Sequence, residues 1–167
     1  MNFKELFDKA GKSSLWLLIV NQIMWRKVPF NKPHRIKITS FSSHSISAKL
    51  PLSRKNKNHL GTMHACAMAA LGEYITGVLL LYHLDPGKYR LIMKDISISF
   101  FYQCKSSAHA TFSLEPNHLI EQINSNLGEE GKTLLPCKVE VHDEEHHHIC
   151  SVSTEWQIKD WSMVKTK

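Results

Sequence analysis

The stretch TMHACAMAALGEYITGVLLLYHL, residues 62–84, decides the fold of this 167-residue chain. Its length and apolar character would suit a membrane span, but Glu73 stands at its middle. A carboxylate at the centre of a bilayer costs about 2.5–3.5 kcal/mol, and the segments on either side alternate as soluble strands do. We therefore expect no transmembrane span. We expect a helix over Thr62–Leu84 that is buried inside a soluble fold and ends at Asp85-Pro86-Gly87.

Segments in which apolar and polar residues alternate lie on both sides of this stretch, two before it and four after it. Such alternation is typical of half-buried strands. Only residues 62–84 are apolar enough to cover the apolar faces of these strands, so the sequence predicts an α+β fold. One antiparallel sheet of about six strands should wrap around one long central helix, with an extra N-terminal helix. The predicted strands are residues 36–39, 45–52, 95–100, 109–114, 137–142 and 150–158, and a short helix is predicted over Pro116–Asn126.

The chain has neither an internal repeat nor a linker, so we expect one main domain over residues 34–160. A helical extension, residues 1–33, should precede it, and a tail, residues 161–167, should follow. Within the extension, the apolar run from Leu15 is too short to span a bilayer and no signal-cleavage site follows it.

We predict a helix over Leu15–Trp25 that packs on the domain through a face containing Leu15, Leu18 and Ile19. An alternative is that this helix lies on a membrane surface, since Trp16, Trp25, Arg26 and Lys27 would suit an interface.

Charge is unevenly distributed along the chain. Residues 1–57 hold twelve Lys or Arg and two acids, whereas residues 58–167 hold nine and thirteen, for a net charge of +6. A basic first third indicates an anionic partner, or simply a solvated basic surface. We expect no nucleic acid, because the sequence lacks a recognition-helix motif and an RNA-binding signature.

The cysteines do not form a metal motif. Their spacings contain no CxxC pair, so we expect no metal site and buried, reduced thiols typical of a cytoplasmic protein. Cys66 has no base within helical reach and should be an inert buried thiol rather than a nucleophile. The run from His142 to His148 falls at a predicted hairpin turn, where a solvated turn is favoured over an adventitious metal site. The four cysteines are Cys66, Cys104, Cys137 and Cys150.

Candidate chemistry gathers around Asn58, His64 and Glu73. A lone carboxylate in an apolar helix is costly unless it is paired, so Glu73 is either functional or bound to a neighbouring polar group. His64 and Glu73 are nine residues apart, which on a helix is roughly 13–14 Å and about half a turn. They could meet only if a second copy of the helix ran antiparallel alongside, as in a two-fold dimer.

The start of the helix offers a second kind of group. Backbone N–H groups there are unpaired and carry the positive end of the helix dipole, which suits a carbonyl oxygen that becomes negative during acyl transfer. Gly61 would allow a close backbone approach. Thr62 could instead cap these N–H groups itself, and the sequence leaves the choice open.

The motif Asn-x-x-Gly-Thr-x-His, residues 58–64, followed nine residues later by an acid in an apolar helix, resembles the hotdog-fold acyl-CoA thioesterases of the phenylacetate-degradation type. The order of strands and helix over about residues 34–160 resembles that superfamily too. The leading helix, Leu50-Pro51-Leu52 and Asn58-His59 resemble an uncharacterised thioesterase-like branch of it.

The resemblance implies hydrolysis of acyl-CoA or acyl-carrier-protein thioesters. Glu73 would be the general base or the nucleophile, and the Ala65 N–H would polarise the thioester carbonyl. His64 and Asn58 would orient the substrate or water from the partner chain. This sequence has Ala65 where the family usually has Gly, and Glu73 where it often has Asp.

The same resemblance implies a homodimer or tetramer that uses coenzyme A only as part of its substrate and needs no other cofactor. The basic residues Arg54, Lys55 and Lys57 could meet the phosphates of coenzyme A or the acidic surface of a carrier protein. The alternative function is a non-catalytic protein that binds acyl thioesters on the same fold.

Overall fold

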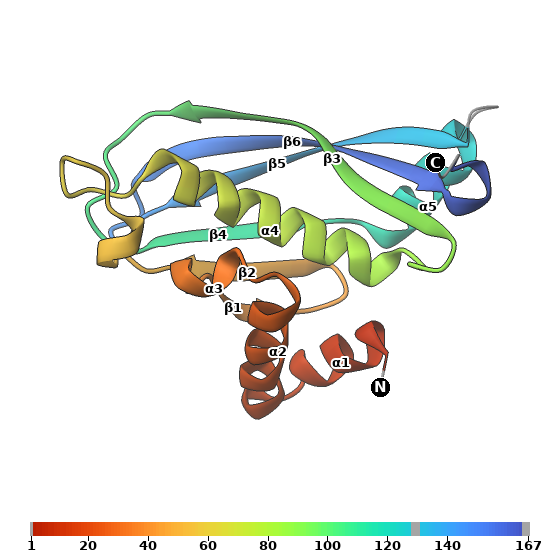
Figure 1. Ribbon diagram of the computed structural model, residues 1–167, viewed down its shortest axis with the longest axis horizontal. Coiled ribbons are helices and arrows are strands. Elements are labelled where there is room, and N and C mark those ends of the chain that lie inside the picture. Colours follow the sequence, from red (N-terminus) through yellow and green to blue (C-terminus); the bar gives the residue numbers. More distant parts are fainter. Residues whose placement is uncertain (1, 128–130, 165–167) are drawn as a thin grey trace.

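Helix α4 (Ala65–His83) lies along a six-stranded sheet, which passes behind it in Figure 1. The computed structural model describes residues 2–127 and 131–164. The strand order is β1-β2-β4-β5-β6-β3, and each neighbouring pair is antiparallel. The predicted α+β class, with one central helix, one antiparallel sheet and an N-terminal helix, is confirmed.

The strands fall where alternation predicted them, but four are longer than expected, and the second ends at residue 50 rather than 52. Strand β3 begins before residue 95. Its first half was not predicted, because a bulge between Met93 and Asp95 interrupts the alternation that marks its second half. The strands are β1 (Lys37–Phe41), β2 (Ser45–Leu50), β3 (Tyr89–Phe100), β4 (Ala108–Ser113), β5 (Lys132–His142) and β6 (His148–Asp160). The other helices are α1 (Phe3–Ala10), α2 (Ser14–Lys27), α3 (Asn31–His34) and α5 (Pro116–Asn126), with 3-10 turns η1 (Arg54–Asn56) and η2 (Trp161–Met163).

Two glycines let α4 lie directly on strand β6. A Cβ atom on Gly72 would come within 2.6 Å of Val152, and one on Gly77 within 2.9 Å of Trp156. The indole Nε1 of Trp156 donates a hydrogen bond to Thr76 Oγ1 at 3.1 Å, which fixes the ring beneath the helix. Helix α4 is long and apolar enough to cross a membrane, but 72% of its apolar window is buried inside the protein, as the core helix of a soluble fold would be.

Helix α2 packs along β1 through a different face from the predicted one. Leu15 and Leu18 are 64% and 51% exposed, whereas Asn21 is buried. The Asn21 amide donates from Nδ2 to Ile38 O at 2.9 Å and accepts at Oδ1 from Ile38 N at 2.8 Å, so it stands where a neighbouring strand would pair. The prediction was wrong because apolar residues of α2 occur on all sides of the helix, so they do not define one buried face. The hydrogen bonds between the Asn21 amide and β1 determine which face packs against the sheet.

Strand β3 forms the opposite edge of the sheet and is incompletely covered. Ile96 and Phe100 lie on the helix side, opposite the buried Thr154 and Cys150 of β6. Even so, Ile96 is 39% exposed and Phe100 is 50% exposed. The sheet therefore presents a long edge with partly exposed apolar side chains next to α4.

The predicted division into extension, domain and tail remains a prediction. Residues 165–167 of the predicted tail lie outside the described residues.

Candidate functional site

The Asn58 side chain shapes the loop that leads into α4. Its Oδ1 accepts hydrogen bonds from the backbone N–H groups of Leu60 at 2.9 Å and Thr62 at 3.1 Å. Its Nδ2 donates to Thr62 Oγ1 at 2.9 Å. Gly61 has φ 79°, and a Cβ there would meet nothing within 4 Å, so the backbone conformation explains this glycine within the chain. The amide of Asn58 thus positions the loop through its own hydrogen bonds.

The helix begins at Ala65, and His64 is its N-cap. The His64 Nδ1 accepts a hydrogen bond from Cys66 N at 3.1 Å, so the ring carries a proton on Nε2. Thr62 does not cap the helix, since its hydroxyl accepts from Asn58. Among the described residues no acceptor meets the Ala65 N–H, which leaves this donor at the positive end of the helix dipole.

A pocket of about 210 Å³ lies in front of this helix start. Asn58, Thr62 and Ala65 line it from the loop and the helix start, and Phe100, the last residue of β3, and Tyr102 line it from the segment after the helix. The structure therefore brings Asn58, Thr62 and Ala65 together around one small pocket, which the predicted residues Gly61 and His64 do not line. Phe100 and Tyr102 were not predicted as site residues.

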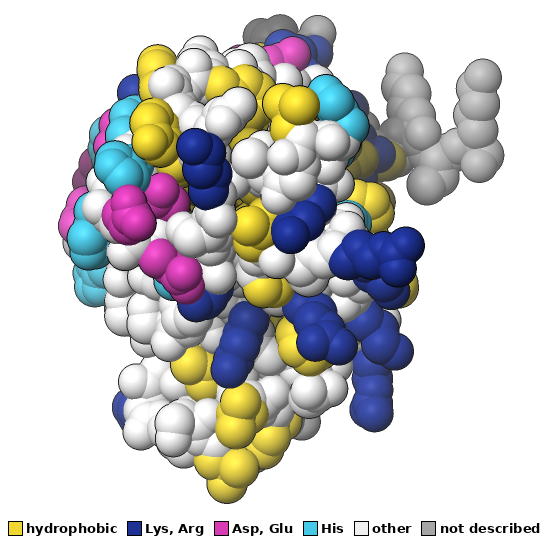
Figure 2. All heavy atoms as spheres, turned by 90° about the vertical axis from the view of Figure 1, so that its left-hand side faces the viewer, with side chains coloured by type: hydrophobic (Ala, Val, Ile, Leu, Met, Phe, Trp, Pro, Cys, Tyr) yellow, Lys and Arg dark blue, Asp and Glu magenta, His cyan; other side chains and the backbone are white. Residues whose placement is uncertain are grey.

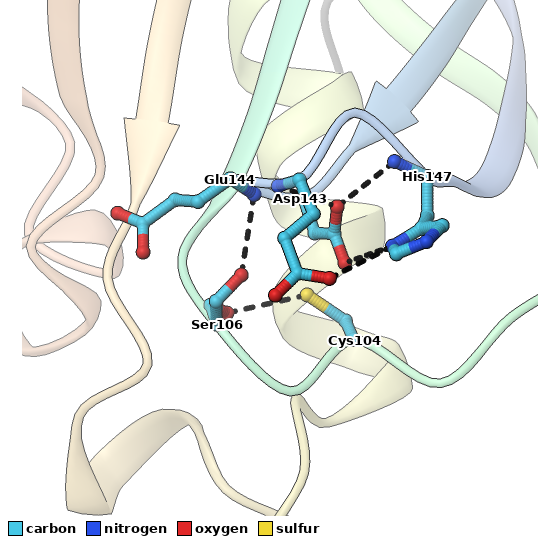
Figure 3. A network of polar contacts seen from close by, with 6 residues as sticks. Cys104, Ser106, Asp143, Glu144 and His147 are labelled. Atoms are coloured by element: carbon cyan, nitrogen blue, oxygen red, sulfur yellow. Dashed lines mark hydrogen bonds and ion pairs between the residues drawn. The ribbon is translucent and has the colours of Figure 1, made fainter.

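A polar network braces the segment that forms the far side of the pocket (Figure 3). The Cys104 carbonyl accepts a hydrogen bond from Met63 N at 2.9 Å, which ties the segment to the site loop. The Cys104 thiol donates to Ser106 O at 3.3 Å, and Ser106 Oγ accepts from Glu144 N at 3.2 Å. The β5–β6 hairpin thereby supports the pocket wall.

Asp143 organises that hairpin. Its Oδ1 accepts from the N–H groups of Glu145 at 3.0 Å and His147 at 2.9 Å, and its Oδ2 lies 3.1 Å from His147 Nδ1 (Figure 3). Burial alone would raise the pKa of the Asp143 carboxyl, but the hydrogen bonds from His147 and Glu145 outweigh it, so the pKa lies below its ordinary value. The prediction of a solvated turn was wrong for Asp143, which is buried. Among the described residues no group of three or more ligand side chains could hold a metal.

Glu73 is half-buried on α4, eight residues beyond Ala65. Burial raises the pKa of its carboxyl above the ordinary value. Within the described part of the chain, its side chain has no hydrogen-bond or ion-pair partner. Eight helical residues advance about 12 Å, so Glu73 and the Ala65 N–H of one chain do not face the same atom. Glu73 is not among the residues that line the pocket.

The residue after Glu73 adds a second buried polar group. The Tyr74 hydroxyl is buried without a hydrogen-bond partner in the ranges that the structure describes. Burial, and secondly the charge of Glu73, raise the pKa of this phenol, so it remains a hydrogen-bond donor at neutral pH.

Other predicted residues are distributed differently. Arg54 and Lys55 lie in η1 and line a separate, larger cleft beside α2 and α3, which Lys57 does not line. Cys104, Cys137 and Cys150 are buried free thiols, but Cys66 is exposed at the first turn of α4. The prediction of a buried Cys66 was wrong because this residue lies on the same helix face as Ala69 and Glu73, which is less covered than the face with the buried Ala67 and Met68.

The comparison with protein families assigns the chain. A family model described as a domain of unknown function (DUF4442) matches residues 18–158. The chain belongs to this family. The DUF4442 range starts within α2 and ends in β6, so it includes the loop, the helix start and Glu73. Among curated proteins, none matches this chain.

Similarity to solved structures shows that this DUF4442 protein has the hotdog fold. PA5026 of Pseudomonas aeruginosa, a protein of unknown function and probable thioesterase, has a TM-score of 0.77 at 21% identity, covering 85% of this chain and 94% of its own. The thioesterase HI1161 of Haemophilus influenzae has a TM-score of 0.68 at 18% identity, with 89% and 92% covered. The thioesterase SAV0944 of Staphylococcus aureus, solved as a glutamine-to-alanine and a glutamate-to-alanine variant, gives 0.63 and 0.64 at 15% identity, with 78% and 98% covered. The fold implied by the resemblance is confirmed.

Proposed function

We propose that the protein hydrolyses acyl thioesters carried by coenzyme A or by an acyl carrier protein. Glu73 would be the general base, and the Ala65 N–H would bind the developing oxyanion. The observation that carries this proposal is a half-buried carboxylate without a described partner, on the helix whose first N–H is left unused. Thioester hydrolysis requires a base and an oxyanion donor, which these two groups supply.

In this mechanism, Glu73 takes a proton from a water molecule, and the oxygen of that water attacks the thioester carbonyl carbon. The carbonyl oxygen becomes negative and accepts a hydrogen bond from the Ala65 N–H at the helix start. The carbon–sulfur bond then breaks, and Glu73 returns its proton to the leaving thiolate. Because the base must be ionised, hydrolysis should increase with pH through the raised pKa of Glu73.

The proposal requires a second copy of the chain. Ala65 and Glu73 are about 12 Å apart along α4, so one substrate carbonyl can meet both only if they come from antiparallel helices. The partly exposed Ile96 and Phe100 on the β3 edge, beside α4, are where such a copy would bury apolar surface. We therefore propose a homodimer with two shared sites.

The Staphylococcus aureus relative supports the assignment of Glu73. The glutamine and the glutamate replaced in its two variant structures are fifteen positions apart. Asn58 and Glu73 have this same spacing. Asn58 would therefore be the amide counterpart of that glutamine, with a side chain one methylene shorter.

Thiol release from acyl-CoAs of several chain lengths, and from an acyl carrier protein, tests the function. Glu73→Gln should reduce turnover about 10²–10⁴-fold, the usual contribution of a general base. Ala65→Pro removes the N–H, and it fits the first helical position because His64 has the extended conformation (ψ 138°) that precedes proline well. Ala65→Gly keeps the N–H and is the matched control.

Mixing the two variants tests the shared site. When Glu73→Gln and Ala65→Pro chains are refolded together, half of the dimers are mixed, and each mixed dimer has one intact site. About a quarter of wild-type activity should return, since a two-fold dimer builds each site from both chains. No recovery in a sample shown to contain mixed dimers would mean that each site lies within one chain.

The same assays decide between hydrolysis and the alternative of binding alone. A protein that binds acyl thioesters without turnover, and whose background release is unchanged by Glu73→Gln, would be a binding protein.

A further inference from the structure

A basic cleft of about 890 Å³ lies between the N-terminal helices and the turn η1. Lys32 and Arg35 line it from α3 and its C-cap, and Arg54 and Lys55 line it from η1. Among the described residues that line the cleft, none is acidic. Figure 2 views this end of the molecule, where Lys and Arg side chains gather apart from the acids and histidines at the left edge. The cleft therefore concentrates positive charge in a concave surface.

The walls of the cleft are held in place before any ligand arrives. The indole Nε1 of Trp25 donates to Ile36 O at 2.7 Å, which fixes a half-buried aromatic ring in the wall. Arg35 has φ 55°, a left-handed conformation that is uncommon for residues other than glycine and that directs the chain away from α3. Ser53 also lines the cleft, and its hydroxyl is buried with no hydrogen-bond partner in the described part of the chain.

The cleft is joined to the proposed active site through Asn56. This residue follows Lys55 directly, and its carbonyl accepts a hydrogen bond from His64 N at 2.7 Å, immediately before α4 begins. Its buried side chain donates to His34 O and Pro51 O, each at 2.8 Å. A ligand held by Lys32, Arg35, Arg54 and Lys55 would thus lie beside the loop that presents the Ala65 N–H.

We propose that this cleft binds a purine nucleotide with several phosphates, namely the phosphorylated adenosine of a coenzyme A thioester. This inference rests on the proposed function and adds the carrier group to it. Guanidinium and ammonium groups bind phosphate oxygens, and the fixed indole offers a face on which a base can stack. The volume is in the range of small-molecule sites, about 300–1,000 Å³. An acidic carrier protein would use the cations but not a recessed aromatic wall.

Equilibrium binding of free coenzyme A, measured by calorimetry, tests the proposal without any hydrolysis. Wild type and Glu73→Gln should bind it equally, so a failure of the proposed catalysis would not affect this result. Lys32→Glu combined with Arg54→Glu should weaken binding at least tenfold, because it replaces two phosphate-binding cations by anions. Lys12→Glu makes the same kind of charge reversal on an exposed residue of the extension outside the cleft, and should leave the affinity unchanged.

Fragments of the ligand identify which part the cleft holds. Adenosine 3′,5′-bisphosphate should bind, and the double variant should weaken it as it weakens coenzyme A, whereas any binding of pantetheine should be unaffected. Equal loss of coenzyme A binding in Lys12→Glu would show a general charge effect and overturn the proposal. ADP binding as tightly as coenzyme A would assign the cleft to free nucleotides and overturn its link to the thioester. If no nucleotide binds, while the double variant hydrolyses acyl carrier protein thioesters more slowly, the cleft serves a protein carrier instead.

Discussion

Replacing Asn56 by alanine should destabilise the protein and disturb its helix start together. The Asn56 side chain is fully buried and makes three hydrogen bonds: Nδ2 to His34 O and to Pro51 O, and Oδ1 with His34 Nδ1 at 2.7 Å. At about 1 kcal/mol for each lost bond, the free energy of unfolding should fall by about 3 kcal/mol. For a chain of this size, 1 kcal/mol corresponds to roughly 2–4 °C, so the melting temperature should fall by about 6–12 °C.

Urea unfolding followed by circular dichroism, together with calorimetry, measures this loss. Asn56→Asp is the closest comparison, because it keeps the acceptor but replaces the donor to both carbonyls by an oxygen. Asn117→Ala, at an exposed position of α5, controls for loss of an amide in general. A loss below about 1 kcal/mol for Asn56→Ala, with unchanged turnover and unchanged coenzyme A affinity, would refute the claim that this amide joins cleft, loop and helix.

Three further predictions concern the core and the charged groups. Burial raises the Glu73 pKa above its ordinary value of 4.5, so the native state binds more protons than the unfolded state and loses stability as pH rises from 4.5 through the raised pKa. Glu73→Gln should therefore have a higher melting temperature than wild type at pH 7, and the same melting temperature below pH 4.5. Gly72→Ala places a Cβ 2.6 Å from Val152 and should cost about 1–3 kcal/mol in urea unfolding, part of which Val152→Ala should restore. The Asp143 pKa lies below its ordinary 3.8 despite burial, because of hydrogen bonds from His147. The ionised carboxylate therefore stabilises the native state at neutral pH, and this stabilisation is lost as pH falls through the lowered pKa. In the same assay, Asp143→Asn should lower the free energy of unfolding at pH 7 and much less at pH 2.

The sequence predicted the sheet and the central helix because both depend on simple periodicity. Alternation located all six strands, and one apolar stretch located α4. Prediction was less accurate where the chain departs from a period. The bulge before Asp95 hid the first half of β3, and apolar residues around α2 concealed the face that Asn21 selects.

The candidate site could be predicted only in part, for a physical reason. Short spacings locate Asn58, His64 and Glu73, and helix geometry already separates the last two. Which atom caps the helix depends on competing hydrogen bonds, and the structure gives Thr62 to Asn58 and the Cys66 N–H to His64. Of the basic cleft, the sequence named only Arg54 and Lys55 as binding residues, because these residues and Trp25 come to line one cleft only through tertiary packing.

The Asn21 amide on the outer edge of β1 also governs how many chains can join. A sheet with two unpaired edges can pair with a further chain at each edge and so form fibres, whereas a sheet with one blocked edge can pair with another chain at its other edge only. Because Asn21 occupies both backbone groups of Ile38, a strand of another chain cannot pair with β1 at this residue, which favours β3 as the edge for pairing between chains. If two copies joined through β3, their sheets would form one continuous sheet whose two outer edges are both β1 strands, each occupied at Ile38 by its own Asn21.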